Sequence, residues 1–362
     1  MKKTLIALAA LAAASGAAMA QSTVTLYGVV DANVNVTRET TVSAPTTTTL
    51  ATSRLSQTGV GSGGQNGSRW GMRVSEDLGG GLAAVATIEA GLNADTGTSA
   101  QGGLAFGRQV FVGLKSSSFG QVTLGRQYSA YDDVHGLFAQ GNNAYDVSLG
   151  NIYNITASDI AATTTTAGLA ALANKASAGV GAWVSYNNAR VNNSIKYQSA
   201  DYGGFSGAVV YGFGENKTTT TSATHDTSFN LKYANGPIMA TVAYQENQYS
   251  TTFKLKNTLV GGSYDLKVVK LFANFNRAKF TSLEAQKEYS LGVQVPIGAL
   301  TLVGQYAHSK GDDLGTNAGY ALEAWYDLSK RTRLYTSFAS TKKELLNDQR
   351  NSVFAAGIRH AF

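Results

Sequence analysis

Residues 24–36 read VTLYGVVDANVNV, and this stretch indicates the fold because two kinds of side chain alternate along it. The even positions are apolar or glycine, and the odd positions between them are mostly polar. Alternation with a period of two places the two kinds on opposite faces of a β-strand. The stretch is longer than the usual strand of a globular protein, and it exceeds the ~9–11 residues with which a tilted strand crosses a membrane. It therefore predicts a membrane-spanning strand with one apolar face.

The same alternation recurs along the chain and predicts sixteen strands, an even number as in single-chain bacterial barrels. Short turns, such as 77–81 and 235–237, alternate with longer polar segments, such as 37–68 and 128–190. Transmembrane β-barrels have short periplasmic turns and longer extracellular loops, whereas a soluble β-sandwich has no reason for this parity. We therefore predict an all-β fold, a sixteen-stranded antiparallel transmembrane β-barrel. Its strands are expected at 24–36, 69–76, 82–92, 106–115, 120–127, 191–199, 204–214, 227–234, 238–246, 257–265, 269–278, 287–296, 300–309, 319–328, 332–340 and 352–362.

Residues 1–20 have the layout of a cleavable secretory signal peptide. Two lysines precede an apolar run at 5–14, and an Ala-Met-Ala sequence ends at Ala20. We expect cleavage between Ala20 and Gln21, which leaves 21–362 as a single barrel domain. The apolar run is too short for a helix that spans ~30 Å of hydrocarbon.

Composition argues against several other classes of protein. The 29 basic and 23 acidic residues are dispersed rather than clustered, so we expect no nucleic-acid binding. None of the four histidines lies in a nucleophile or zinc motif, so we do not expect an enzyme. Cysteine is absent, so disulfides do not hold the exported chain together. We expect no cofactor and no metal site, except that Ca²⁺ could bind surface carboxylates such as Asp132 with Asp133, or Asp312 with Asp313.

Several motifs together resemble a known family, the Gram-negative general porins of the type found in Neisseria, Bordetella and Burkholderia. The resemblance covers essentially all of 21–362. It implies an outer-membrane homotrimer with one water-filled pore per subunit, assembled by a barrel assembly machinery that reads the C-terminal aromatic residue, here Phe362. The motifs that carry the resemblance are Leu26-Tyr27-Gly28, Ser68-Arg69-Trp70-Gly71, Ser75-Glu76-Asp77-Leu78-Gly79, Val112-Gly113-Leu114-Lys115, Phe119-Gly120-Gln121-Val122-Thr123-Leu124-Gly125-Arg126-Gln127 and Gly357-Ile358-Arg359-His360-Ala361-Phe362.

The resemblance also implies how the pore is narrowed. In these porins the third extracellular loop folds into the barrel, and the long segment 128–190 has the matching position after the fifth strand. A mobile surface loop is the alternative. An acidic Pro-Glu-Phe-Gly-Gly-Asp tip of the enteric branch is missing from this segment, and the candidate acidic residues of the constriction are Asp132, Asp133 and Asp146.

A ladder of arginines faces the loop in general porins. Matching residue by residue places Arg69, Arg126 and Arg190 in this ladder, and strand parity adds Arg73. Arg126 reaches the lumen only if its strand bends at Gly125, because it shares parity with apolar residues. Each arginine could instead be a solvated charge at a strand end or a contact with lipopolysaccharide phosphate.

The charged residues at inward-facing strand positions determine the expected ion selectivity. Basic residues outnumber acidic ones, which predicts a weak anion preference. We therefore predict a general-diffusion porin for passive transport of ions and small hydrophilic solutes, in contact with outer-membrane lipid and lipopolysaccharide. The alternative is a substrate-specific channel for a sugar or a carboxylate, in which Trp183 and Trp325 could contribute to an aromatic track. The lumen charges are expected to be Arg69, Arg73, Lys196, Lys232, Lys270, Arg333 and Arg359 against Asp31, Glu89, Glu288, Glu323 and Asp327.

Overall fold

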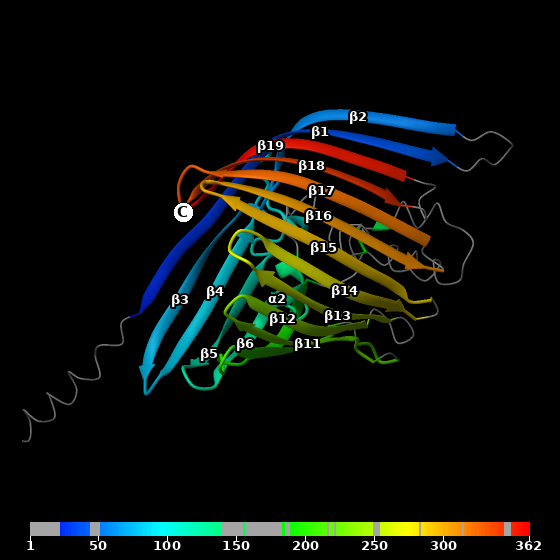
Figure 1. Ribbon diagram of the computed structural model, residues 1–362. Helices are drawn as coiled ribbons and strands as arrows, with labels where there is room; N and C mark the ends of the chain where they lie inside the picture. The colour runs from blue at the N-terminus through cyan, green and yellow to red at the C-terminus, as the bar shows by residue number, and fades with distance from the viewer. Residues whose placement is uncertain are drawn as a thin grey trace, which may run out of the picture.

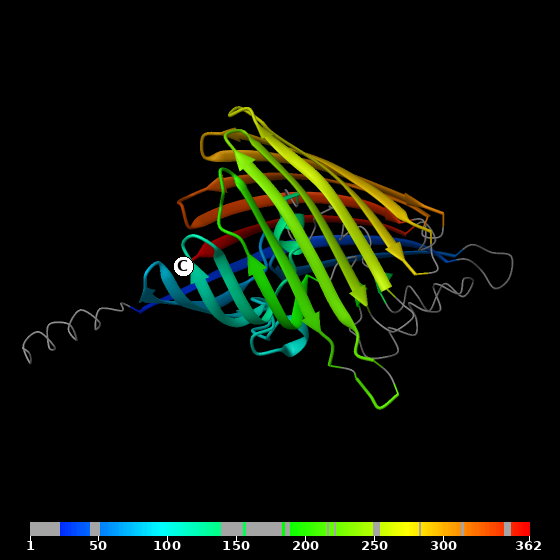
Figure 2. The same cartoon turned by 90° about the horizontal axis from the view of Figure 1, so that it is seen from below.

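The computed structural model describes residues 22–43, 51–138, 155–156, 183–184, 189–215, 217–220, 222–248, 254–281, 284–312, 315–343 and 349–362. They form a closed antiparallel barrel whose strands follow one another around the wall (Figures 1 and 2). The wall strands are β1 (Thr23–Ser43), β2 (Ala51–Ser62), β3 (Arg69–Gly79), β4 (Leu82–Gly91), β5 (Gln109–Ser116), β6 (Gly120–Tyr128), β9 (Arg190–Gln198), β10 (Phe205–Phe213), β11 (His225–Asn235), β12 (Ile238–Gln248), β13 (Lys254–Asp265), β14 (Lys270–Phe280), β15 (Gln286–Ile297), β16 (Leu300–Gly311), β17 (Gly315–Asp327), β18 (Thr332–Lys343) and β19 (Gln349–Ala361).

The wall has sixteen strands because β2 and β3 are two parts of one strand. Both pair with β1: β3 along residues 23–29 and β2 along residues 32–43. Residues 63–68 leave the wall between them and form hydrogen bonds with Asp31, whose carboxylate accepts from the backbone of Gln65 and Asn66 at 2.9 and 2.7 Å. The barrel closes where β1 pairs with β19. The predicted fold class and the even number of strands are thus confirmed.

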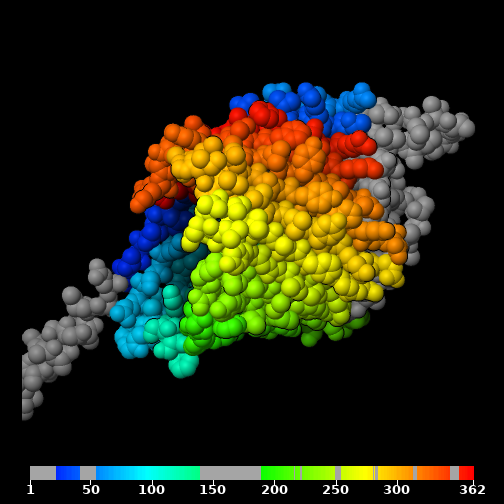
Figure 3. Space-filling model, viewed as in Figure 1, coloured from blue at the N-terminus to red at the C-terminus, as the bar shows by residue number. Residues whose placement is uncertain are grey.

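Burial in this barrel is the reverse of that in a soluble protein. On β14 the polar Asn274 and Asn276 are buried, whereas Leu271 and Phe275 are 47% and 43% exposed. Most other wall strands follow the same rule, and their apolar residues are exposed on the outside of the barrel, one face of which Figure 3 shows. In water, so large an exposed apolar area would be unfavourable. Such a surface is favourable when it faces the hydrocarbon of a membrane.

One sequence expectation about the strands is wrong. Segment 37–68 was expected to be a long loop, but β1 continues to Ser43 and β2 covers Ala51–Ser62. Residues 51–62 are rich in Ser, Thr and Gly and lack the apolar alternation of a lipid-facing strand. Their strand structure comes from register pairing with β1, which local sequence does not encode.

The described chain also contains small elements that are not part of the wall. These are η1 (Gln101–Gly103), α2 (Asp132–His135), η2 (Gly136–Phe138), and the pair β7 (Ile155–Thr156) and β8 (Trp183–Val184). Among the described residues, no helix has the length and apolar character needed to cross a membrane. The elements α2 and η2 matter for the site, because they follow directly after β6.

Candidate pore constriction

A cluster of arginines surrounds one buried carboxylate on the inner face of β3, β4 and β5. Glu89 on β4 is 3% exposed and accepts a hydrogen bond from Arg108 Nε at 2.7 Å. Its other oxygen accepts from the Tyr27 hydroxyl at 2.9 Å and lies 3.8 Å from Arg69 Nε. Two hydrogen bonds and one ion pair, from three segments, therefore hold this carboxylate, as a buried charge requires.

Two tyrosines extend the cluster along the wall. The Tyr128 hydroxyl at the end of β6 accepts from Arg108 at 2.7 Å and from Arg190 at 2.9 Å. The Arg190 guanidinium also lies 4.7 Å from the centre of the Tyr128 ring. Arg73 lies 4.1 Å from the centre of the Tyr27 ring. Arginine suits this arrangement because its planar group stays charged while it stacks on a ring and donates hydrogen bonds. We name Arg69, Arg73, Arg108 and Arg190 the arginine cluster.

Arg126 lies next to this cluster, and β6 has the irregularity that the sequence required of it. The pairing of β6 with β9 shifts between Gly125 and Gln127, and Gly125 has a φ of 139°. Arg126 donates to the carbonyl of Gly107 at 2.8 Å and to the side chain of Asn192. The buried Gln127 instead bonds to Thr123. Arg126 is thus held by the β5 and β9 side of the wall, and its part in a constriction stays a prediction.

Residues 129–138, which follow β6, contact side chains that point inward from the opposite wall. Tyr131 is 2% exposed, and its hydroxyl donates to Asn276 on β14 at 3.0 Å. The carbonyl of Phe138 accepts from Gln305 on β16 at 3.1 Å. Phe138 also fills the space beside Gly261 on β13, where a Cβ would lie 2.4 Å from its ring. A buried apolar cluster joins this segment to the wall and consists of Tyr131, Val134, Phe138, Ala243 and Leu259.

The predicted acidic residues have different surroundings. Asp133 forms an ion pair with Lys196 of β9 at 2.6 Å rather than with a member of the arginine cluster. Burial raises the pKa of Asp133 to about 6, although Lys196 acts in the opposite direction. The backbone amide of Asp132 donates to the Ser129 hydroxyl at 3.1 Å. Asp146 lies outside the described residues, as do Ala20 and Gln21 of the predicted cleavage site.

Phe362, the predicted assembly signal, ends the wall beside the first strand. Its backbone exchanges two hydrogen bonds with Gly28, both at 3.1 Å. A Cβ at Gly28 would lie 2.3 Å from the tip of the Phe362 ring, so the glycine of the Leu-Tyr-Gly motif leaves room for this ring. The C-terminus is therefore tied to β1 at the point where the barrel closes.

Sequence analysis did not include Arg108, Tyr27 or Tyr128 in the site. The predicted strand 106–115 gave Arg108 the same parity as the apolar Val110 and Val112, whereas in the structure β5 begins only at Gln109. The sequence nonetheless contains a pattern that points to Arg108. The tripeptide Gly-Arg-Gln occurs at 107–109 as well as at 125–127, where it contains the predicted pore residue Arg126. Tyr27 and Tyr128 become informative only when the wall brings them beside arginines from other strands.

Other predicted lumen charges form a second group, at the periplasmic end. Arg333 donates two hydrogen bonds to Asp327, at 2.6 and 3.0 Å, and lies 4.6 Å from the centre of the Trp325 ring. Arg359 occupies the register position opposite Arg333. Among the described residues, no three His, Asp or Glu side chains gather as metal ligands would.

Comparison with known proteins agrees with this architecture. A family model described as Gram-negative porin matches residues 7–344. The chain is 31% identical to an outer membrane porin protein of Bordetella pertussis, over the whole of both chains. It is 33% identical to outer membrane porin protein 32 of Delftia acidovorans, covering 99% of this chain and 95% of that one. Among solved structures, the anion-selective porin from Comamonas acidovorans matches with a TM-score of 0.72 and 25% identity, covering 94% of this chain and all of the other. The chain belongs to the Gram-negative porin family and forms a channel in the outer membrane rather than an enzyme.

Proposed function

We propose that this channel is a general-diffusion porin with a weak preference for anions. The observation that carries this proposal is the arginine cluster, in which Arg69 and Arg108 contact the carboxylate of Glu89 while Arg73 and Arg190 stack on Tyr27 and Tyr128 beside it. A net positive charge inside a narrow, low-dielectric wall concentrates anions and repels cations. The similarity to an anion-selective porin supports the same sign of preference.

The narrow part of the pore is proposed to lie between the arginine cluster and the segment after β6. Residues 129–138 already reach Asn276 on β14 and Gln305 on β16 from inside. Most of segment 128–190 lies outside the described residues, so the inward folding of the whole segment is part of the proposal. Asp132, Asp133 and Asp146 are its acidic candidates; the pairing of Asp133 with Lys196 favours a role in anchoring the segment.

A substrate-specific channel for carboxylates is the second candidate. Arg69 and Arg73 lie on the inward parity of β3 with Gly71 between them, and their guanidinium groups could hold a carboxylate solute. Such a channel would saturate with its solute, whereas a general pore conducts in proportion to concentration.

The remaining expectations concern assembly. We propose a homotrimer, export through the signal peptide, and recognition of Phe362 by the barrel assembly machinery. Phe362 supports the last of these, because its backbone pairs with Gly28 of β1 at the point where the barrel closes.

Single-channel recording of the purified protein in a planar bilayer tests these points together. A general trimeric porin opens in groups of three steps, conducts in proportion to salt concentration and gives a reversal potential that favours the anion. The Arg69→Ala variant should reduce that potential. Single small steps that one solute blocks at saturating concentration would favour the specific channel and refute the general one.

A further inference from the structure

The outer face of β14, β15 and β16 carries three adjacent cations near the extracellular ends of the strands. Arg277 lies directly opposite Lys287, and Lys287 lies directly opposite Lys310. All three are exposed and alternate with buried inward residues, so they point away from the lumen. We name these three residues the outer basic row.

No carboxylate of the described chain neutralises this row. Glu246 on β12, an acidic residue of the same outer face, is already paired with Lys254 and Lys256 at 2.7 and 3.4 Å. Like charges at directly opposed strand positions destabilise a sheet. A row of three such cations is therefore a favourable site for an anion from outside the chain.

The level of the row in the membrane follows from the residues below it. Two residues further toward the periplasm on each strand lie Phe275, Tyr289 and His308, which are also opposite one another. The rings of Tyr289 and His308 stack, with centroids 5.0 Å apart. Aromatic residues of this kind mark the boundary between hydrocarbon and headgroups. The outer basic row accordingly lies at the headgroup level of the outer leaflet.

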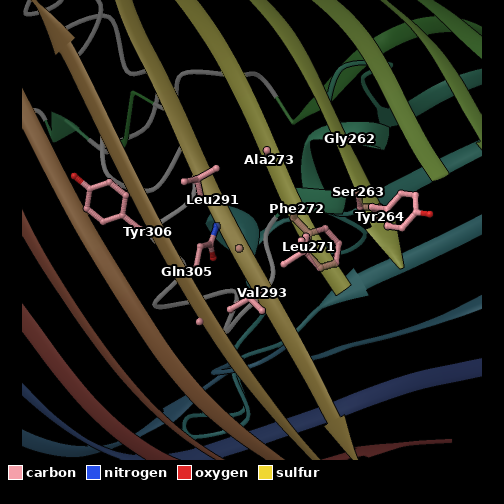
Figure 4. Close-up of a pocket in the computed structure, with 12 residues that line it drawn as sticks. Gly262, Ser263, Tyr264, Leu271, Phe272, Ala273, Leu291, Val293, Gln305 and Tyr306 are labelled. Carbon is pink, nitrogen blue, oxygen red and sulfur yellow. The ribbon is translucent and has the colours of Figure 1, made fainter. Parts of the chain in front are cut away.

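An apolar groove opens on the same strands below the aromatic residues. Its volume is about 760 Å³, within the range of sites that hold small organic ligands. Small residues, Gly262, Ala273 and Gly304, form its outward-facing floor. Figure 4 shows Tyr264 and Tyr306 on opposite sides of it, with Leu291 between them. Ala273 is four residues from Arg277 along β14, a separation of about 13 Å in a strand.

We propose that this surface binds one lipid of the outer leaflet that carries more than one phosphate, as the lipid A part of lipopolysaccharide does. Its phosphates contact Arg277, Lys287 and Lys310, and one of its acyl chains occupies the groove. Three cations in a row, which form no ion pair with the described residues, favour this lipid over a phospholipid, which offers a single phosphate. The groove favours an acylated ligand over free phosphate, because its lining is almost entirely apolar.

Native mass spectrometry of the full protein in detergent tests the phosphate contacts, with bis-phosphorylated lipid A as the probe. We expect the triple variant Arg277→Gln, Lys287→Gln, Lys310→Gln to weaken binding by about a hundredfold, since each cation near a membrane surface contributes on the order of 1 kcal/mol. Lys287→Gln alone should weaken binding about fivefold on the same basis. The matched control is Lys267→Gln, Lys330→Gln, Arg331→Gln, which removes three exposed charges at the periplasmic end and should bind as the wild type does. Heat-modifiable gel mobility verifies that each variant is folded.

Two further arms test the chemistry of the ligand and the groove. Lipid A without phosphates and phosphatidylglycerol should both bind more weakly than the probe. Ala273→Leu should fill the groove and reduce affinity for the probe several-fold, whereas Ala324→Leu, on β17 outside the groove, should not. Unchanged binding by the folded triple variant, equal loss in the periplasmic control, or equal binding of the phosphate-free lipid would each overturn the proposal. Because none of these measurements involves conduction, they leave the proposed pore function untouched.

Discussion

At the scale of single residues, Gly125 determines how β6 meets its neighbours. Its φ of 139° lies in a region that residues with a side chain rarely adopt, and a Cβ there would lie 2.1 Å from the carbonyl oxygen of Val110. We expect Gly125→Ala to lower the free energy of unfolding by about 1–3 kcal/mol. Urea titration in detergent measures the change. Gly59→Ala, where a Cβ would meet no atom within 4 Å, is the control and should leave the midpoint nearly unchanged.

We expect Asp133 to make the ion selectivity of the pore depend on pH. Its pKa is raised to about 6 by burial, so the carboxylate gains a proton as the pH falls from about 7 to about 5. Protonation removes the negative charge beside Lys196, and the anion preference should therefore increase in that range. Reversal potentials measured at several pH values test this. The Asp133→Asn variant should show the low-pH selectivity at all of them; a wild-type dependence that survives in this variant would assign the effect to another group.

At the scale of elements, the segment after β6 should limit the size of solutes that pass. Phe138 is 1% exposed and anchors the segment to β13 and β16. Phe138→Ala removes buried contacts whose loss costs up to about 3–5 kcal/mol, enough to release a short segment. We expect larger sugars to enter in a liposome swelling assay. Leu137→Ala, at an exposed neighbouring position, is the control, and an unchanged size limit for Phe138→Ala would show that residues 129–138 do not narrow the pore.

Elements also show which parts of the structure the sequence could predict. Strands that face lipid were found because each alternates apolar and polar residues, as β14 does. By contrast, β2 was missed because its residues Ala51–Ser62 carry no such pattern and are ordered by pairing with β1. Arg69 and Arg190 were predicted at the site from motifs. Arg108 was not, because it joins the site through Glu89 and Tyr128, which belong to other strands.

At the scale of the whole molecule, the barrel separates lipid from the lumen because apolar and polar residues alternate along its strands. Apolar residues cover the outside, and buried polar residues line the inside, where Asn276 and Gln305 bond to the segment after β6 and Glu288 accepts a hydrogen bond from Asn276. Closure between β1 and β19 leaves no unpaired strand edge in the described wall, as a lipid environment requires. Selectivity then depends on which charges the closed wall brings together, and here these are the arginine cluster and Glu89.

The central claim is that the arginine cluster and Glu89 set the ion selectivity. Two variants that change the charge of this site in opposite directions test it most directly. Glu89→Gln removes the only carboxylate that contacts the arginine cluster among the described residues, and Arg108→Gln removes one of its four cations. Reversal potentials in a KCl gradient should shift toward the anion for Glu89→Gln and toward the cation for Arg108→Gln. Shifts of opposite sign, in variants that fold and insert as the wild type does, would support the arginine cluster as the selectivity element. Unchanged potentials, or shifts in the same direction, would contradict it.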